Sequence, residues 1–577
     1  MRLGRLVRNI LTLLLLALPC VVLLPRLNAP IALPESALDQ LLTARYTAAH
    51  NRLGTPVLRP LDVARLTSFG DGALPDMRHG MLYTGLSAVA MKVLHETQGG
   101  QGQRAATLLG MGLLLTGGLV TLWLYRRWFP QRDNKLAAFF YVWSGGALLA
   151  AVLPGPGLLL AILGGLLCAA LVSLDVTSSS SRSSLWLALA AGALWGLLFL
   201  SLYSALLLLP FLLWQVVVTT RRDIRAVLAF VVAAGVVAAP QLLRAQKFAH
   251  NPLYHSRGIE LIMRTESHPG TALYHAVSLP RTVSTYLTHG GFLEVLSKSA
   301  STLVELLPRS LGTVGLCLLL FITSGLMRFT DQRLNRLRRL LFLMIPVHLI
   351  ALSLFFPADE CASVLLLYGP AIAVLGAAFL QTTIHARRLP RLHARGVRLA
   401  WTVLCCGAGL AQLLALRPAP APIRLYAFLG NSGAYLDRLQ TSHDGVLAAD
   451  APETMALYAD VPVTLLPTSS TDFQEVEARL NKEIVGFSLT PNLRWDRPED
   501  TALQAWGDTY RRVLGLFALT QLMPNNERET LRQYVSYPDS LIASIRSFQV
   551  TPIQEPQQGN DYSALFWDMD YIRAIPR

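Results

Sequence analysis

The chain has 577 residues and a formal net charge of +14, but only 15% of its residues are charged whereas 53% are hydrophobic. A soluble chain of this length carries about a quarter charged residues, and several segments here reach the roughly 20 apolar residues that cross a bilayer. The composition therefore excludes an ordinary soluble protein, and the basic charge, which falls in short arginine clusters between apolar runs, is typical of cytoplasmic loops and not of nucleic-acid binding.

The first eight residues include three arginines, and an apolar run from Ile10 to Leu24 follows them. Signal peptides and first membrane spans both begin this way. Because many apolar segments follow, we expect an uncleaved first helix. The next loop, 28–103, holds the densest mixture of Asp, Glu, Arg and His before the middle of the chain, and we expect it to form one wall of any chemical site.

Two pairs of residues in this loop are candidates for chemistry. Glu35 and Asp39 are four residues apart and share one face of a helix. A carboxylate there can act as a general base on an acceptor hydroxyl, although capping of the helix by its first turn explains Glu35 equally well. Arg78 and His79 are candidates for binding a phosphate or donating a proton, and contact with lipid headgroups explains them equally well.

Segment 80–95 is apolar but short, and Lys92 interrupts it. If this segment crossed the bilayer, later clusters such as Arg126-Arg127 would face away from the cytoplasm, against the positive-inside preference. We therefore predict that 80–95 lies on the membrane surface, that the N-terminus is cytoplasmic, and that about 11 helices span a bacterial inner membrane. The predicted spans are 10–27, 104–125, 135–153, 157–174, 184–200, 201–218, 225–241, 307–327, 338–356, 361–384 and 397–416.

The second large outside loop, 242–306, carries Arg244, Lys247 and Arg257. Cations just outside the bilayer run against the positive-inside trend. A lipid-linked phosphate supplies a reason for them, because guanidinium groups pair bidentately with phosphate oxygens. Contact with headgroups, or an ion pair with Glu260, is the alternative.

Residues 1–416 form the predicted transmembrane domain, and the Pro-rich link after Leu416 leads to a hydrophilic region, 417–577, which the same topology places outside. Strand and helix patterns alternate there. The predicted fold class is a mainly α polytopic membrane protein with a C-terminal periplasmic α/β domain. The predicted strands are Gly445–Ala449, Val461–Leu466 and Ile484–Leu489, and the predicted helices are Pro452–Tyr458, one to Lys482 capped by Asp472, 499–522 and 526–548.

No metal or cofactor is expected. All six cysteines lie in or beside apolar segments, which argues against a disulfide framework and a cysteine-ligated zinc site. His-Glu-x-x-His, Gly-x-Ser-x-Gly and Walker A motifs do not occur in the sequence. Asp568-Met-Asp570 is a three-residue match to the metal and nucleotide-sugar motif of soluble transferases, too short to be specific.

The order of these segments resembles the GT-C superfamily of polyprenyl-phosphate-sugar-dependent glycosyltransferases, particularly the bacterial protein-mannosyltransferase and aminoarabinose-transferase-like group (glycosyltransferase family 39-like). Five short motifs carry the resemblance, in the family's order and on the expected side of the membrane. They are His79-Gly-Met-Leu-Tyr83, Leu124-Tyr-Arg-Arg-Trp-Phe129, the glycine-rich stretch from Gly192 to Tyr203, Pro240 to Pro252, and Asp450 to Pro467.

The resemblance implies inverting transfer of a sugar from an undecaprenyl-phosphate carrier to a glycan, lipid or protein acceptor of the cell envelope, in an outward-facing cavity. The lipid-linked sugar is then the donor substrate, and no separate cofactor is implied. Asp39 or Glu35 would be the base. The candidate substrate-binding residues are Arg78, His79, Arg244, Lys247, Arg257 and Tyr368.

The sequence departs from the family's pattern at acidic positions. The usual Asp-Glu before Ala44-Arg45 would fall near Ser36-Ala37, and Gly155 stands where a second-loop Asp is expected. A second hypothesis is therefore a catalytically degenerate relative that binds or assembles envelope glycans. A third, a transporter or flippase, is disfavoured because the spans carry almost no charge and the sequence indicates no paired broken helices.

Overall fold

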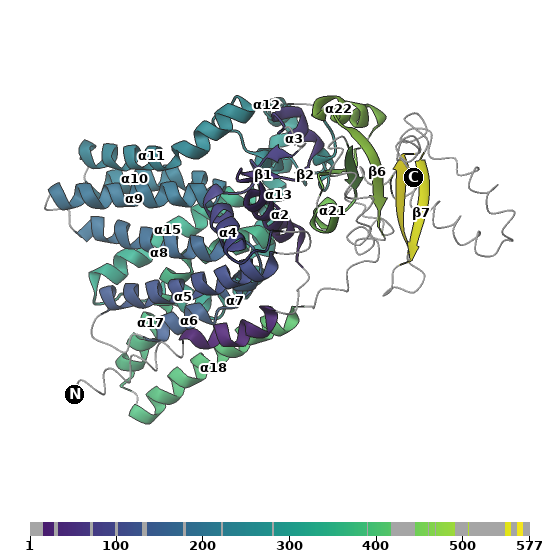
Figure 1. Ribbon diagram of the computed structural model, residues 1–577. Helices are drawn as coiled ribbons and strands as arrows, with labels where there is room; N and C mark the ends of the chain where they lie inside the picture. Colours follow the sequence, from purple (N-terminus) through teal and green to yellow (C-terminus); the bar gives the residue numbers. More distant parts are fainter. Residues whose placement is uncertain are drawn as a thin grey trace.

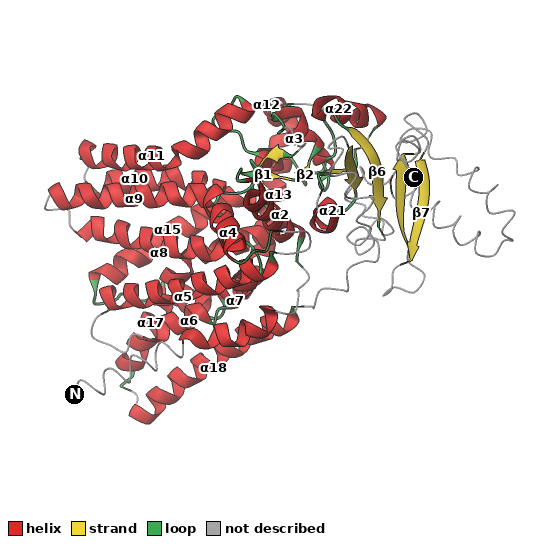
Figure 2. Ribbon diagram, in the orientation of Figure 1, coloured by secondary structure: helices red, strands yellow, loops and turns green. Residues whose placement is uncertain are grey.

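A computed structural model of the protein describes residues 16–27, 33–69, 73–97, 102–129, 135–176, 181–220, 223–279, 282–388, 390–416, 445–459, 461–467, 469–490, 506, 548–554 and 562–568. Long helices lie side by side through most of the molecule, and the strands are confined to one end of them (Figures 1 and 2). This end carries the two loop regions and the C-terminal segments. We call it the sheet end.

The helices of the first half are α2 (Glu35–His50), α3 (Pro60–Arg65), α4 (Met81–Val93), α5 (Gln103–Trp128), α6 (Lys135–Val142), α7 (Gly145–Val152), α8 (Gly157–Val176), α9 (Ser181–Ser201), α10 (Leu209–Thr219) and α11 (Ile224–Ala249). Those of the second half are α12 (Val283–Tyr286), α13 (Phe292–Val314), α14 (Cys317–Ser324), α15 (Gln332–Ser353), α16 (Ala358–Val364), α17 (Gly369–Ala386), α18 (Arg391–Ala415), α21 (Pro452–Ala459) and α22 (Ser470–Leu480). Short 3-10 turns are η1 (Leu24–Leu27), η2 (Tyr203–Leu208), η3 (Ser256–Leu261), η4 (Ala272–Tyr274) and η6 (Leu365–Tyr368), and η5 (Leu287–Gly291) is a π-turn.

The protein is a multi-pass membrane protein, but the predicted number of about 11 spans is not confirmed. Within the described residues, six helices are long and apolar enough to cross a bilayer, or up to eight if each of two bent helix pairs forms one span. Three of the predicted spans are not counted. Residues 10–15 of the first, 10–27, lie outside the described residues. The predicted span 201–218 divides into η2 and the 11-residue α10, and four arginines begin α15, which contains most of 338–356.

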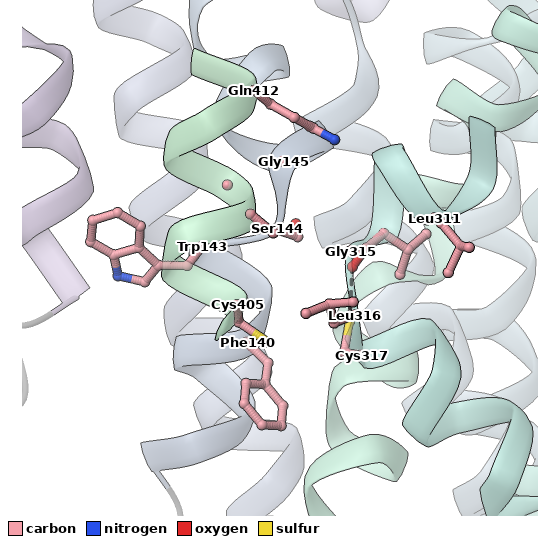
Figure 3. Close-up of a pocket in the computed structure, with 13 residues that line it drawn as sticks. Phe140, Trp143, Ser144, Gly145, Leu311, Gly315, Leu316, Cys317, Cys405 and Gln412 are labelled. Atoms are coloured by element: carbon pink, nitrogen blue, oxygen red, sulfur yellow. Dashed lines mark hydrogen bonds between the residues drawn. The ribbon is translucent and has the colours of Figure 1, made fainter. Parts of the chain in front are cut away.

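Two helix pairs are bent at a short break, which the sequence did not indicate, and each pair is either one broken span or a re-entrant loop. Helices α6 and α7 meet at 55°, and α13 and α14 meet at 114°. Gln412 of α18 lies beside Gly145 (Figure 3). Its Nε2 donates to Gly312 O at 2.7 Å. A Cβ on Gly145 would lie 1.6 Å from Gln412 Oε1, so a larger residue there requires the Gln412 side chain to move. A cavity of about 60 Å³ remains beside it.

Helix α4 covers most of the segment predicted to lie on the membrane surface. Its 13 residues rise about 20 Å, less than the roughly 30 Å of a bilayer core. One side of α4 packs against α2, where Gln40 donates to Thr84 Oγ1 at 2.8 Å. The helix is not among the candidate spans of the described chain, and its position in the membrane surface stays a prediction.

A six-stranded sheet joins the first loop to the C-terminal region. Its order is β2 (Val57–Leu58), β5 (Val463–Leu465), β4 (Gly445–Ala449), β6 (Glu483–Leu489), β8 (Tyr562–Asp568) and β7 (Phe548–Gln554). The first four strands run parallel to one another, β8 is antiparallel to β6, and β7 is antiparallel to β8. A separate two-stranded sheet pairs β1 (Gly54–Thr55) with β3 (Leu74–Pro75). Residues more than 400 positions apart therefore share one set of hydrogen bonds.

The five predicted elements between 445 and 490 are present, within a few residues of their expected bounds. The cap of α22 is Ser469, whose Oγ accepts from Asp472 N at 3.1 Å, and not Asp472 as expected. A serine at the N-cap satisfies a free backbone N–H in the same way. The helices predicted at 499–522 and 526–548 lie outside the described residues, apart from Trp506 and Phe548. The boundaries of a separate C-terminal domain stay a prediction.

Candidate functional site

The first ionic group at the sheet end is built around Asp39 of α2. Arg59, which precedes α3, donates to Asp39 Oδ2 at 2.6 Å and lies 3.5 Å from Glu453 Oε1 of α21. The side chains of Asp39 and Arg59 are 2% and 4% exposed, and that of Glu453 is 12% exposed. We call these three residues the sealed cluster. It joins the first loop to the C-terminal sheet.

The pKa values of the two carboxyl groups in the sealed cluster are shifted in opposite directions. Burial raises the pKa of Asp39, but the positive charges of Arg59, His79 and Arg78 outweigh it and hold that pKa below its ordinary value. Burial raises the pKa of Glu453 to about 7 although Arg59 opposes the shift. Asp39 is therefore the ionised partner of Arg59, and Glu453 exchanges a proton near neutral pH.

Asp76, Arg78 and His79 continue this network toward the helices. Asp76 Oδ1 accepts from the backbone N–H groups of Arg78 and His79 and lies 3.3 Å from His79 Nδ1. Burial raises the pKa of Asp76, but His79 and these hydrogen bonds bring it to about 2. Arg78 Nε lies 3.4 Å from Asp39, and its guanidinium lies 5.3 Å from the centre of the Tyr274 ring.

The second ionic group belongs to the second loop. Arg257 of η3 pairs with both oxygens of Glu260, at 2.6 and 2.9 Å, and also donates to Glu360 of α16. Glu260 accepts further bonds from Tyr274 at 2.8 Å and Arg264 at 3.1 Å. Burial raises the pKa of Glu260, but Arg257 outweighs it and holds the pKa far below its usual range. Glu260 is thus ionised at neutral pH.

A cavity of about 300 Å³ lies beside Arg257, between the second loop and the helices. Its walls are mostly apolar, and its polar lining residues come from α3, from η2 and from the segment 251–257. Phe356 packs under the Arg257 guanidinium, 4.4 Å away. The cavity is lined by Arg65, Tyr203, Ser204, Leu206, Leu207, Asn251, Leu253, Tyr254, His255, Arg257, Gly258, Ile259, Val283, Phe355 and Phe356.

Contacts with neighbouring residues fix the polar side chains that line the cavity. His255 stacks on Tyr203 with ring centres 4.2 Å apart, and its Nε2 lies 3.1 Å from Arg78 O. Burial lowers the pKa of His255 to about 3, so this ring is neutral at physiological pH. Tyr254 donates to Asp62 Oδ1 at 3.0 Å. The histidine therefore positions the wall and carries no charge into the cavity.

The catalytic and substrate-binding candidates named from the sequence lie in different parts of the structure. Asp39, Arg78 and His79 meet in the first network, Arg257 lines the cavity, and Glu35 lies exposed at the start of α2. Arg244 donates to Leu53 O at 2.7 Å, and Lys247 is exposed beside Phe248. Tyr368 is buried among the helices, where its hydroxyl lies 2.7 Å from His348 Nδ1. The structure does not bring Lys247 or Tyr368 to the cavity.

Sequence reasoning missed the partners of these residues. Arg59, Glu453 and Tyr274 come from three regions that only the folded chain brings together. Glu260 was considered only as an alternative partner for nearby cations, and that ion pair exists. A buried charge needs a partner of opposite sign, so the arginine-rich loops signalled that partners existed without showing which. No group of three or more His, Cys, Asp or Glu residues suited to a metal occurs among the described residues.

No protein-family model matches the sequence, and no curated protein matches it. Among solved structures, the chain is similar to the oligosaccharyltransferase AglB of Archaeoglobus fulgidus, solved in complex with an inhibitory peptide and a dolichol-phosphate. The TM-score is 0.51 at 12% identity, over 87% of this chain and 72% of that one. ArnT of Cupriavidus metallidurans, bound to undecaprenyl phosphate, gives 0.49 at 14% identity, over 83% and 93%. The likeness to AglB shows a shared fold.

Proposed function

We propose that the protein is a glycosyltransferase that moves a sugar from a polyprenyl-phosphate carrier to an acceptor of the cell envelope. The observation that carries this proposal is the amphipathic cavity. Its apolar wall suits the first isoprene units of a lipid, and Arg257 and Arg65 beside that wall suit a phosphate. The relative that shares the fold was solved with a dolichol-phosphate and a peptide, a lipid phosphate and an acceptor of the kinds proposed here.

The position of the basic clusters, at the end of the helices opposite the sheet, supports an outward-facing cavity. Ala105, near the start of α5, packs in the same apolar core as Leu447 of the sheet. Arg127, roughly 33 Å further along the helix at 1.5 Å per residue, donates to Ser173, and Arg333 donates to Arg127 O. The basic clusters therefore gather at the end opposite the sheet. By the positive-inside preference we propose that this end is cytoplasmic and that the cavity is periplasmic.

For the chemical step we propose Asp39 as the base and the carrier phosphate, held by Arg257, as the leaving group. Within the described chain, Asp39 Oδ1 is buried without a hydrogen-bond partner, whereas Oδ2 binds Arg59. A buried unpaired carboxylate oxygen is costly and suits a polar ligand such as an acceptor hydroxyl. Exposed Glu35 has no such environment. The acceptor must then reach Asp39 from the cavity through the Arg78 and Tyr274 region.

A second candidate function is a carrier-binding or assembly protein without transferase activity. The observation that favours it is the low pKa of Asp39 together with its 2.6 Å contact to Arg59, because both make a weak base. Glutamine or asparagine substitutions separate the two functions, since they keep the shape of a carboxylate and remove its basicity.

The test is complementation of a strain that lacks the gene, with mass spectrometry of envelope lipids and glycans. We expect Asp39→Asn to lose the sugar modification by at least about a hundredfold while binding undecaprenyl phosphate like the wild type. The matched control is Glu35→Gln, one helical turn away, which should keep the modification. Full modification by both variants would reject Asp39 as the base, and carrier binding with unchanged glycans in the deletion strain would favour the second candidate.

A further inference from the structure

Arg257 is shared by two carboxylates that differ in how firmly they are held. The Glu260 side chain is 2% exposed and also accepts from Tyr274 and Arg264. The Glu360 side chain is 34% exposed, and its carboxylate contacts the same guanidinium at Nη2. Glu260 is therefore a fixed partner of Arg257, and Glu360 is the partner that water and dissolved ions can reach.

The charges of this group are balanced before any ligand arrives. Arg257 and Arg264 carry two positive charges, and Glu260 and Glu360 carry two negative ones. A phosphate that approaches Arg257 meets a neutral group there unless one carboxylate leaves. Departure of Glu360 costs least, because its side chain returns to water, whereas Glu260 would leave buried charges unpaired.

We propose, building on the carrier site described above, that Glu360 is a positioning residue that occupies Arg257 until the carrier phosphate replaces it. The exchange sets how tightly the cavity holds its anion. It also frees the segment that contains Phe355 and Phe356, which line the cavity and lead into α16. The ligand class is a phosphate on a polyprenyl lipid, and the exchange involves its phosphate oxygens only.

Asp359 provides a matched comparison. It is the neighbouring acidic residue in the first turn of α16, but its side chain is 79% exposed and pairs with Arg309 at 2.9 Å. Its partner Arg309 does not line the cavity, whereas Arg257, the partner of Glu360, does. Removal of either acidic charge changes the net charge of this turn equally, so a difference between the two variants reports the contact with Arg257.

The experiment measures binding of undecaprenyl phosphate, and separately of inorganic phosphate, to the full-length protein in zwitterionic lipid nanodiscs. We expect the Glu360→Gln and Glu360→Ala variants to bind undecaprenyl phosphate about three- to tenfold more tightly than the wild type. The affinity rises because the phosphate no longer competes with a partly exposed ion pair for Arg257. Asp359→Asn and the conservative Glu360→Asp should stay within about twofold of the wild type.

A gain with undecaprenyl phosphate, with or without a matching gain for inorganic phosphate, supports the exchange, and a gain with neither ligand overturns it. Equal affinities for the Glu360→Gln, Glu360→Ala and Asp359→Asn variants also overturn it. A wild-type protein that binds no undecaprenyl phosphate contradicts the proposed function itself. If the wild type binds the carrier and Arg257→Gln weakens that binding while Glu360 variants change nothing, only the exchange is wrong.

Discussion

The sealed cluster and the Arg257–Glu360 pair use the same chemistry in two environments. Asp39 and Arg59 are almost completely buried and connect the first loop to a helix of the C-terminal region through Glu453. Arg257 and Glu360 connect two loops as well, but one of them is a third exposed and the other lines a cavity. The contact of Arg59 with Asp39 Oδ2 therefore holds the architecture, whereas the Glu360 side of Arg257 is open to a dissolved ligand.

This difference has an energetic basis. Removing one partner of a buried ion pair leaves an uncompensated charge and costs several kcal/mol, whereas an exposed pair contributes little. The sealed cluster should consequently dominate stability, and the exposed side of Arg257 should dominate affinity. Each substitution below tests one side of this division.

The largest expected effect is the loss of Arg59. Arg59→Met leaves Asp39 and Glu453 facing each other without the cation between them, so we expect the free energy of unfolding to fall by about 3–5 kcal/mol. Denaturant or thermal unfolding of the detergent-purified protein measures the loss. The double variant Asp39→Leu with Arg59→Met should recover part of it, and a loss under about 1 kcal/mol would show that the cluster is not a structural contact.

Arg257 comes next. Arg257→Gln removes the cation that we assign to the carrier phosphate, and we expect affinity for undecaprenyl phosphate to fall about tenfold to a hundredfold. Lys247→Gln is the control, because Lys247 is exposed and lies outside the cavity lining. Equal losses in both variants would mean that general attraction between cations and the lipid phosphate, and not this cavity, holds the carrier.

The third effect is a dependence of stability on pH. Burial raises the pKa of Glu453 to about 7, above the roughly 4.3 of an unfolded glutamate. The folded protein therefore binds this proton more tightly, so the contribution is present below about pH 4 and is lost as the pH rises through about 7. Glu453→Gln should remove about 1–2 kcal/mol of this dependence. An unchanged slope of stability between pH 4.5 and 7 in that variant would contradict the assignment.

The smallest effect belongs to the exposed pairs of Arg309. This residue contacts Glu305 at 3.0 Å and Asp359 at 2.9 Å, and the side chains are 36–79% exposed. Arg309→Gln should change the free energy of unfolding by less than about 1 kcal/mol. A larger loss would show that exposure alone does not separate structural contacts from weak ones.

The sequence predicts the local structure of this molecule better than its contacts. The strand and helix patterns of 445–490 give five elements close to their observed bounds, because each pattern is short and periodic. The cations of the second loop are likewise visible in sequence as an exception to the positive-inside trend. Arg257, predicted from that exception, lines the cavity.

The long-range features could not be predicted in the same way. The pairing of Val57 with Val463 and of Arg59 with Glu453 depends on the tertiary fold, which periodicity does not encode. The break between Trp143 and Gly145 has no proline, and α18 packs closely against it, since a Cβ on Gly409 would lie 2.3 Å from Trp143 O. Tyr368 was a candidate for substrate binding, but its hydroxyl lies 2.7 Å from His348 Nδ1 inside the helices.

The central claim is that the cavity beside Arg257 holds the carrier phosphate. The most direct measurement is crosslinking of the full-length protein in nanodiscs with a photoreactive polyprenyl phosphate, followed by peptide mapping. The account predicts labelling of 251–259 and of Phe355-Phe356, reduced by excess undecaprenyl phosphate and by Arg257→Gln. Labelling confined to other segments, or labelling of the cavity that Arg257→Gln does not reduce, would contradict it.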